Sequence, residues 1–145
     1  LVLLSEFAVP WVAAETPFAM ELGLEWIESN EERFASAGWA ALLFFAGYAA
    51  DEEIDKEVFS QLLHRVEKEV HSAPNRVRYA MNGFVIAVGS YIPSLTKRAQ
   101  EVASTIGKVS VEMGGTACKV PLATEYLEKA IARDKIGVKR KSARC

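Results

Sequence analysis

The sequence has few of the residues that build disulfide scaffolds or metal centres. Its 145 residues include two cysteines, Cys118 and Cys145, and two histidines, and it contains no Cys-x-x-Cys pair. His64 and His71 lie seven residues apart on a charged stretch without a nearby third ligand, whereas structural zinc sites use four ligands. The sequence therefore predicts free thiols in a reducing compartment, which favours the cytoplasm, and neither a metal nor another cofactor.

Long apolar runs are also missing. The longest, WAALLFFAGYAA at residues 39–50, is shorter than the ~20 residues that a membrane helix needs. The first residues, LVLLSEFAVPWV, include neither a methionine nor the basic segment of a signal peptide. We expect a protein without membrane contact, whose first residue here lies inside a longer chain.

The composition is that of a globular domain, with 50% hydrophobic and 25% charged residues. The net charge of −2 conceals an asymmetry, because residues 127–145 carry seven Lys or Arg against Glu128 and Asp134 and are therefore at +5. The remaining residues are at −7. A cationic end on an acidic body indicates either contact with a polyanion or a solvated, disordered end.

Hydrophobic residues recur at helical spacing from Leu1 to Ile106. Thr16, Ser29 and Asp51 are the predicted N-caps of three of the helices, and Glu32 is expected to complete a capping box with Ser29. The helix that ends near residue 49 is apolar on most sides and should be central. The following helix is one-sided, and its predicted inner stripe comprises Ile54, Val58, Leu62, Val66 and Val70.

The predicted helices form three antiparallel pairs of about forty residues each. A single pair cannot bury its apolar face, but stacked pairs can, so the pattern favours an all-α, HEAT-like helical-repeat solenoid. A compact helical bundle is the competing architecture. We expect residues 1–133 to form the repeat domain and residues 134–145 to form a basic C-terminal tail.

The period changes after Ile106. Residues 108–113, KVSVEM, alternate apolar and polar side chains and predict an extended crossing without a partner strand. Gly114 and Gly115 then permit a sharp turn with positive φ. No Walker pattern surrounds Lys119, so we interpret MGGTACKVP (113–121) as a connector in which a buried Cys118 thiol fixes the turn and Pro121 restarts a helix.

Residues 78–130 resemble the C-terminal part of the DNA alkylation repair proteins, the AlkD-like HEAT-repeat group. The features that carry the resemblance are a helix containing Met-Asn, a helix ending Ile-Gly-Lys, a Cys-x-x-Pro turn and a final helix with Tyr126. Residues 16–43 are similar to the repeat of this family in which a Trp-Ile helix end leads into a helix with the pattern Arg-Ala-Gly.

The resemblance implies a solenoid whose basic concave side holds double-stranded DNA with salt-sensitive affinity. In the best-known branch of the family the enzyme is a DNA glycosylase that excises cationic alkylated bases. A carboxylate and aromatic side chains beside the lesion stabilise the positive charge that develops on the sugar. A relative that binds DNA without this chemistry, and a HEAT-like scaffold that binds protein, remain alternatives.

Carried onto this sequence, the resemblance makes Glu6 the candidate catalytic carboxylate, whose alternative role is that of a solvent-facing helix residue. The other candidate for this role is a carboxylate upstream of Leu1. The family arginine falls on Ser36, and the expected tryptophan is replaced by Tyr79 or Phe84. Trp26 and Trp39 are expected in the core. The predicted DNA-binding residues are Arg76, Arg78, Tyr79, Asn82, Lys108 and Lys119. For the arginines and Asn82, solvated side chains and an interhelix cap are the alternatives.

Overall fold

The computed structural model describes residues 2–143, so the predictions for Leu1, Arg144 and Cys145 lie outside the described residues. No strand occurs among the described residues, and none of the helices there combines the length and apolar character needed to cross a membrane. The elements are η1 (Leu4–Ala8), α1 (Val9–Ala14), α2 (Ala19–Trp26), α3 (Glu32–Tyr48), η2 (Asp51–Glu53), α4 (Lys56–Glu69), η3 (Val70–Ser72), α5 (Asn75–Tyr91), η4 (Pro93–Leu95), α6 (Thr96–Ile106) and α7 (Ala123–Ala132).

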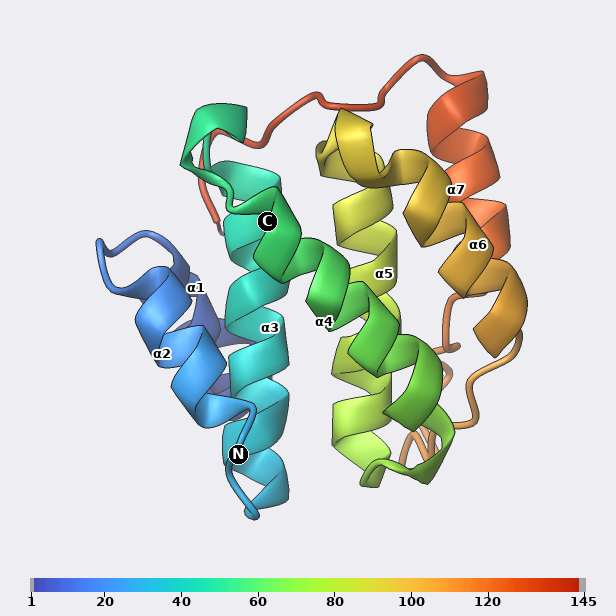
Figure 1. The fold of residues 1–145 in the computed structure, drawn as a ribbon. Helices are drawn as coiled ribbons and strands as arrows, with labels where there is room; N and C mark the ends of the chain where they lie inside the picture. Colours follow the sequence, from blue (N-terminus) through green and yellow to red (C-terminus); the bar gives the residue numbers. More distant parts are fainter. Residues whose placement is uncertain (1, 144–145) are drawn as a thin grey trace.

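The helices form two layers, as Figure 1 shows. One layer contains α1, α3, α5 and α7, each packed against the next. The other contains α2, α4 and α6, and α4 and α6 cross in front of the first layer in Figure 1. The pairs α2/α3, α4/α5 and α6/α7 therefore stack side by side. This arrangement confirms the predicted all-α solenoid of helix pairs and excludes the compact bundle.

The core lies between the two layers. The rings of Trp39 on α3, Phe59 on α4 and Phe84 on α5 are all fully buried. Their centroids lie 5.2 Å apart for Trp39–Phe84 and 5.6 Å apart for Phe59–Phe84. Side chains of this size each contribute ~1.5–3 kcal/mol on full burial. The central position of α3 and the core location of Trp39 are thus confirmed, whereas Val58 of the predicted α4 stripe is only half-buried and Phe59 takes its place.

Two helices begin later than their predicted caps. Thr16 is not the N-cap of α2, which starts at Ala19 after Phe18. Its hydroxyl donates to the Ala13 carbonyl (2.8 Å) and accepts from the Phe18 N–H (3.3 Å) in the turn before the helix. Asp51 belongs to the short turn η2, and Asp55 caps α4 by accepting a hydrogen bond from the Val58 N–H at 3.2 Å. A turn precedes each helix and delays its start. In α4 the cap is then supplied by Asp55, which lies closer to the first helical turn than Asp51.

The capping box predicted for Ser29 and Glu32 is wrong. The Ser29 hydroxyl accepts from the Glu31 N–H at 3.2 Å, and the Glu32 carboxylate accepts from the Arg76 N–H at 2.7 Å. The first N–H groups of a helix lack intrahelical partners, so Glu32 on α3 supplies a cap to the first turn of α5. This contact joins the starts of the two central helices.

The segment between α6 and α7, which we call the connector (residues 107–122), is extended as predicted. Gly114 and Gly115 have φ values of 66° and 74°, the left-handed region that favours glycine. The Asn75 side chain replaces a partner strand, because its amide donates to the Glu112 carbonyl (2.9 Å) and accepts from the Glu112 N–H (2.6 Å). Cys118 is exposed, so the prediction of a buried thiol is wrong.

The chain after α7 turns back over the body, as the red segment of Figure 1 shows. We call residues 134–143 the strap. Its Gly137 and Arg140 N–H groups donate to the carbonyls of Ser90 and Gly47, both at 2.8 Å, and the Lys139 ammonium donates to Ala46 at 2.8 Å. These carbonyls belong to the last turns of α3 and α5, which lack intrahelical donors and favour cations. Much of the cationic end is therefore bound to the helix ends.

A glycine at the crossing of α5 with α6 and α7 gives a test of this packing. A Cβ on Gly89 would lie 2.5 Å from Leu127 Cδ2 and 2.9 Å from Ala99 Cβ. We expect Gly89→Ala to lower the free energy of unfolding by ~1–3 kcal/mol because the crowded helices must separate. The matched control is Gly83→Ala on the same helix, where a Cβ meets only the end of the Leu43 side chain. The better helix propensity of alanine should offset that contact. Equal midpoints in urea unfolding would contradict the close crossing.

Candidate nucleic-acid interface

One surface of α5 is not covered by the second helix layer. Its residues follow at intervals of three and four, which places them on one side of the helix. These residues are Arg76, Tyr79, Gly83, Ile86 and Ser90. Together with the neighbouring surfaces of α3 and α7 they form what we call the inner face. Two hollows open on it, one beside Arg76 and the other beside Gly83 and Ile86.

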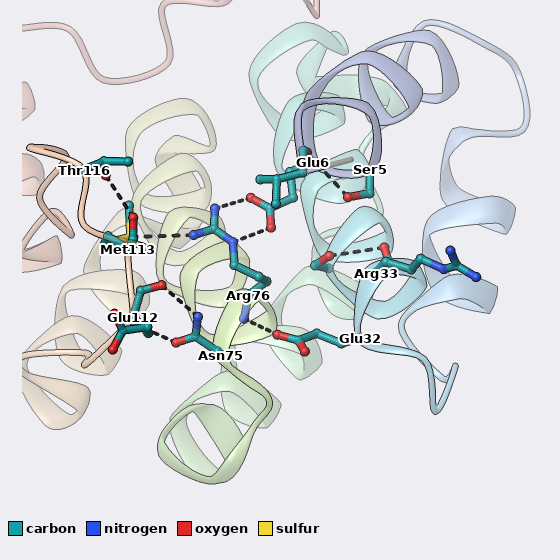
Figure 2. A network of polar contacts seen from close by, with 11 residues as sticks. Ser5, Glu6, Glu32, Arg33, Asn75, Arg76, Glu112, Met113 and Thr116 are labelled. Atoms are coloured by element: carbon teal, nitrogen blue, oxygen red, sulfur yellow. Dashed lines mark hydrogen bonds and ion pairs between the residues drawn. The ribbon is translucent and has the colours of Figure 1, made fainter.

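At the start of α5 a guanidinium is held by a carboxylate from η1, as Figure 2 shows. Arg76 Nε and Nη2 donate to the two oxygens of Glu6 at 2.6 and 2.5 Å. The Glu6 side chain is 4% exposed and that of Arg76 is 20% exposed. The guanidinium also lies 4.7 Å from the centre of the Tyr79 ring. The hydrogen bonds to Glu6 raise the pKa of Arg76, and burial raises the pKa of the Tyr79 phenol.

This geometry limits what both charged groups can do. Because Glu6 is buried, its alternative role as a solvent-facing residue is excluded. A carboxylate stabilises a developing positive charge best when no other cation already occupies it. Glu6 is fully engaged by Arg76, and the charge of Arg76 is offset in the same way. The pair is thus an internal tie between η1 and α5.

The hollow beside this pair, which we call the N-terminal cleft, has a volume of about 830 Å³. Its charged lining contains more acid than base, namely Glu6, Glu31 and Glu32 against Arg33 and Arg76. It also includes the half-buried Trp26, which the sequence had predicted in the core. Ser36, at the family arginine position, is 1% exposed and donates to the Arg33 carbonyl at 3.2 Å. The exposed cation of this helix turn is Arg33, which pairs with Glu31 at 3.0 Å.

The second hollow, which we call the basic groove, has the opposite charge. It lies between α3, α5, α7 and the strap and has a volume of about 540 Å³. Its charged lining residues are all cations, with no carboxylate among them: Lys129, Arg133, Lys135 and Arg140. Neither Lys129 nor Arg133 forms an ion pair with a carboxylate of residues 2–143. Its apolar lining includes Leu43, Phe44 and Ile86.

Two tyrosines complete the basic groove. Tyr126 on α7 is 49% exposed, and the Lys129 ammonium lies 5.5 Å from the centre of its ring. Tyr91 at the end of α5 accepts a hydrogen bond from Arg140 Nε at 2.8 Å. The sequence signalled these cations through the charge excess of residues 127–145. It gave no indication that α7 and the strap bring them together beside Gly83, because that depends on long-range folding.

The predicted DNA-binding residues separate into three groups. Arg76 and Tyr79 lie on the inner face. Arg78 and Asn82 hold the connector, since Arg78 donates to the Ser110 carbonyl at 3.0 Å and the 1%-exposed Asn82 donates to that of Pro121 at 2.8 Å.

The third group consists of the exposed Lys108 and Lys119, which line a separate hollow of about 520 Å³ under the connector. Of the two proposed replacements for the family tryptophan, Phe84 is in the core and Tyr79 is half-buried on the inner face.

No protein-family model matches the chain. An uncharacterized protein of Listeria monocytogenes is 36% identical over 129 residues, which are 89% of this chain and 54% of that protein. An uncharacterized protein of Listeria innocua is 36% identical over 124 residues, 86% of this chain and 52% of that protein. The chain thus spans about half the length of the curated relatives it matches.

Comparison with a solved structure shows which fold this chain shares with known proteins. The solved structure represents a family described as related to the HEAT-like repeat DNA glycosylases and as having affinity for branched DNA structures. It superposes with a TM-score of 0.89 at 30% identity and covers 99% of this chain and 61% of the solved one. The chain has the HEAT-like repeat fold. The resemblance to the HEAT-like repeat DNA glycosylase group is confirmed, and the paired helices α2/α3, α4/α5 and α6/α7 are its repeats.

The tie between η1 and α5 can be tested by removing one charge. Glu6→Gln leaves the Arg76 guanidinium largely buried without a counter-charge, so we expect a loss of ~3 kcal/mol in the free energy of unfolding. The matched control is Glu31→Gln, which breaks a pair whose side chains are 66% and 60% exposed. Exposed pairs contribute at most ~1 kcal/mol. Similar small losses in both variants, measured by urea unfolding, would contradict a buried tie.

Proposed function

We propose that this chain binds DNA through its inner face, with the basic groove as the principal contact. The observation that supports this proposal is the charge of that groove, whose ionisable lining includes four cations and no acid. The N-terminal cleft on the same face has an excess of acid, so the expected phosphate contacts fall toward α7 and the strap. Lysine and arginine gain affinity for DNA by displacing the counterions of its phosphates.

The comparisons support the same proposal. The HEAT-like repeat structure that superposes on 99% of this chain belongs to a family with affinity for branched DNA. That protein is longer than this chain, so we assign to the chain a share of the DNA contact rather than the whole. A HEAT-like scaffold for proteins is the alternative, and it predicts no salt-sensitive affinity for DNA.

The cations of α7 give a direct test of DNA binding. We expect Lys129→Ala and Arg133→Ala to weaken binding to DNA and each to reduce the slope of log K against log salt by ~0.9, the value for one phosphate contact. The control is Lys68→Ala, which removes an exposed lysine from α4 in the other layer. Fluorescence anisotropy at several salt concentrations measures both the affinity for DNA and the slope of log K against log salt. Equal slopes for all three variants and the unaltered chain would contradict the proposed interface.

Arg76→Ala and Arg78→Ala are less suitable for this purpose. Arg76 holds Glu6, and Arg78 donates to the carbonyls of Ala73 and Ser110. Loss of either side chain disturbs the start of α5 and the connector as well as the charge of the surface. Weakened DNA binding in these variants would therefore combine an unfolding effect with a binding effect.

We further propose that Glu6 does not serve base excision in this chain. A catalytic carboxylate must face the developing charge on the sugar, whereas both oxygens of Glu6 accept from Arg76. We expect no release of 7-methyl or 3-methyl purines from alkylated duplex DNA, measured by chromatography of the freed bases. Release that is absent from Glu6→Gln protein shown to be folded by circular dichroism, but intact in Glu31→Gln, would overturn this view and make Glu6 catalytic.

A further inference from the structure

We propose that the basic groove holds an unpaired nucleotide of branched DNA, with its base against Tyr126 and its phosphate at Lys129 and Arg133. This inference rests on the proposed DNA binding and specifies the part of a branched DNA that the groove recognises. It concerns the residues of α7 and the strap, to which the sequence resemblance assigned no role beyond the presence of Tyr126.

The groove is lined by cationic, aromatic and apolar side chains, a combination that fits a single strand better than a duplex. Phosphates of paired DNA need only cations at a surface, and an apolar floor has nothing to contribute to them. Single-stranded nucleic acid instead requires a positive track together with aromatic side chains on which bases can stack. The groove supplies both, since its four cations line it together with Tyr126 and with apolar residues that include Leu43 and Ile86.

The size of the groove agrees with this occupant. Its volume of about 540 Å³ lies within the range of ~300–1,000 Å³ typical of small-molecule pockets. A nucleotide is a ligand of that class, whereas a duplex with a major groove alone ~12 Å wide is far too large to enter. Paired DNA can therefore lie across the inner face, whereas the groove can accept only an unpaired nucleotide.

The side chains of α7 are placed for such a ligand. Tyr126 is 49% exposed, so part of its side chain is accessible to a ligand, and the Lys129 ammonium lies 5.5 Å from the centre of its ring. Lys129 and Arg133 are four residues apart and therefore neighbours on one side of α7. A base stacked on Tyr126 would have its own phosphate within the reach of these cations.

The opposite wall of the groove is the strap, and it is fixed in place. The strap is bound to α3 and α5 through the Gly47 and Ser90 carbonyls. Arg140 on this wall donates to the Tyr91 hydroxyl, with its guanidinium carbon 5.7 Å from the centre of that ring. The groove is therefore preformed, so binding incurs little entropic cost for ordering the strap.

An acidic peptide would also meet the four cations, but it would leave the exposed Tyr126 ring without a partner. The aromatic side chain is therefore the feature that favours a nucleotide over a peptide. An oligo-glutamate competitor makes this rival occupant an outcome of the test.

The test compares two labelled DNAs by fluorescence anisotropy, a perfect duplex and the same duplex with a single-stranded oligo-thymidine flap. We expect the unaltered chain to bind the flapped DNA more tightly. Tyr126→Ala should weaken binding to the flapped DNA about tenfold and change duplex binding less than about twofold, since stacking of one base is lost. Tyr126→Phe, which keeps the ring, should retain the preference.

The matched control is Phe34→Ala. Phe34 is 44% exposed, and the Arg33 guanidinium lies 5.4 Å from its ring centre, so it is a comparable aromatic–cation pair in the N-terminal cleft. This variant should bind both DNAs as the unaltered chain does. Circular dichroism establishes that each variant is folded.

The two proposals fail in different ways. If neither DNA binds, the proposed function itself is wrong. If duplex and flapped DNA bind equally, or Tyr126→Ala weakens both equally, DNA binding stands and the nucleotide site is wrong. Competition by oligo-glutamate as strong as that by oligo-thymidine would assign the groove to acidic peptides.

Photocrosslinking gives an independent test of the site. Iododeoxyuridine in the flap should crosslink to the tryptic peptide Val120–Lys129, and a crosslink confined to other peptides would overturn the proposed site.

Discussion

The structure depends on the packing of α5 against α3. The apolar side of α5 carries Phe84 into the ring cluster with Trp39 and Phe59, which packs α5 against α3 and α4. The first turn of α5 holds η1, α3 and the connector by side-chain hydrogen bonds, and its last turn holds the strap. The inner face exists because the remaining side of α5 is left uncovered. A loss of register between α3 and α5 would therefore alter the core and the binding surface together.

Burial determines which charged side chains of the inner face are paired within the protein and which remain available to a ligand. Arg76 enters a region where an unpaired ion costs several kcal/mol, so it is retained there only with Glu6 as its partner. Lys129 and Arg133 remain near solvent on α7 and keep their charge available. The arginines predicted to bind DNA, Arg76 and Arg78, are thus engaged by other parts of the chain. The cations that can meet a phosphate come from the segment that the sequence left undecided between a polyanion contact and a solvated end.

The features that the sequence predicted correctly are those set by local chemistry and periodicity. The buried side of α5, including Val77, Met81 and Val88, and the positive φ at Gly114 follow from spacing and residue type alone. The errors occur where a partner distant in the sequence decides the outcome. Glu32 caps α5 instead of its own helix, and no local rule anticipates that choice. The groove beside Gly83 was missed for the same reason, since three helices and the strap must meet to form it.

The basic strap contacts the ends of α3 and α5 and also lines the basic groove. The last turns of α3 and α5 present carbonyls with a partial negative charge, which would repel a phosphate approaching the groove. The Lys139 ammonium covers one of these carbonyls, and backbone N–H groups of the strap cover two others. Lys135 and Arg140 on the same segment line the groove itself. One short cationic segment thus supplies donors to the ends of α3 and α5 and adds cations to the groove beside them. The strap therefore contributes both to the stability of the fold and to its proposed affinity for a polyanion.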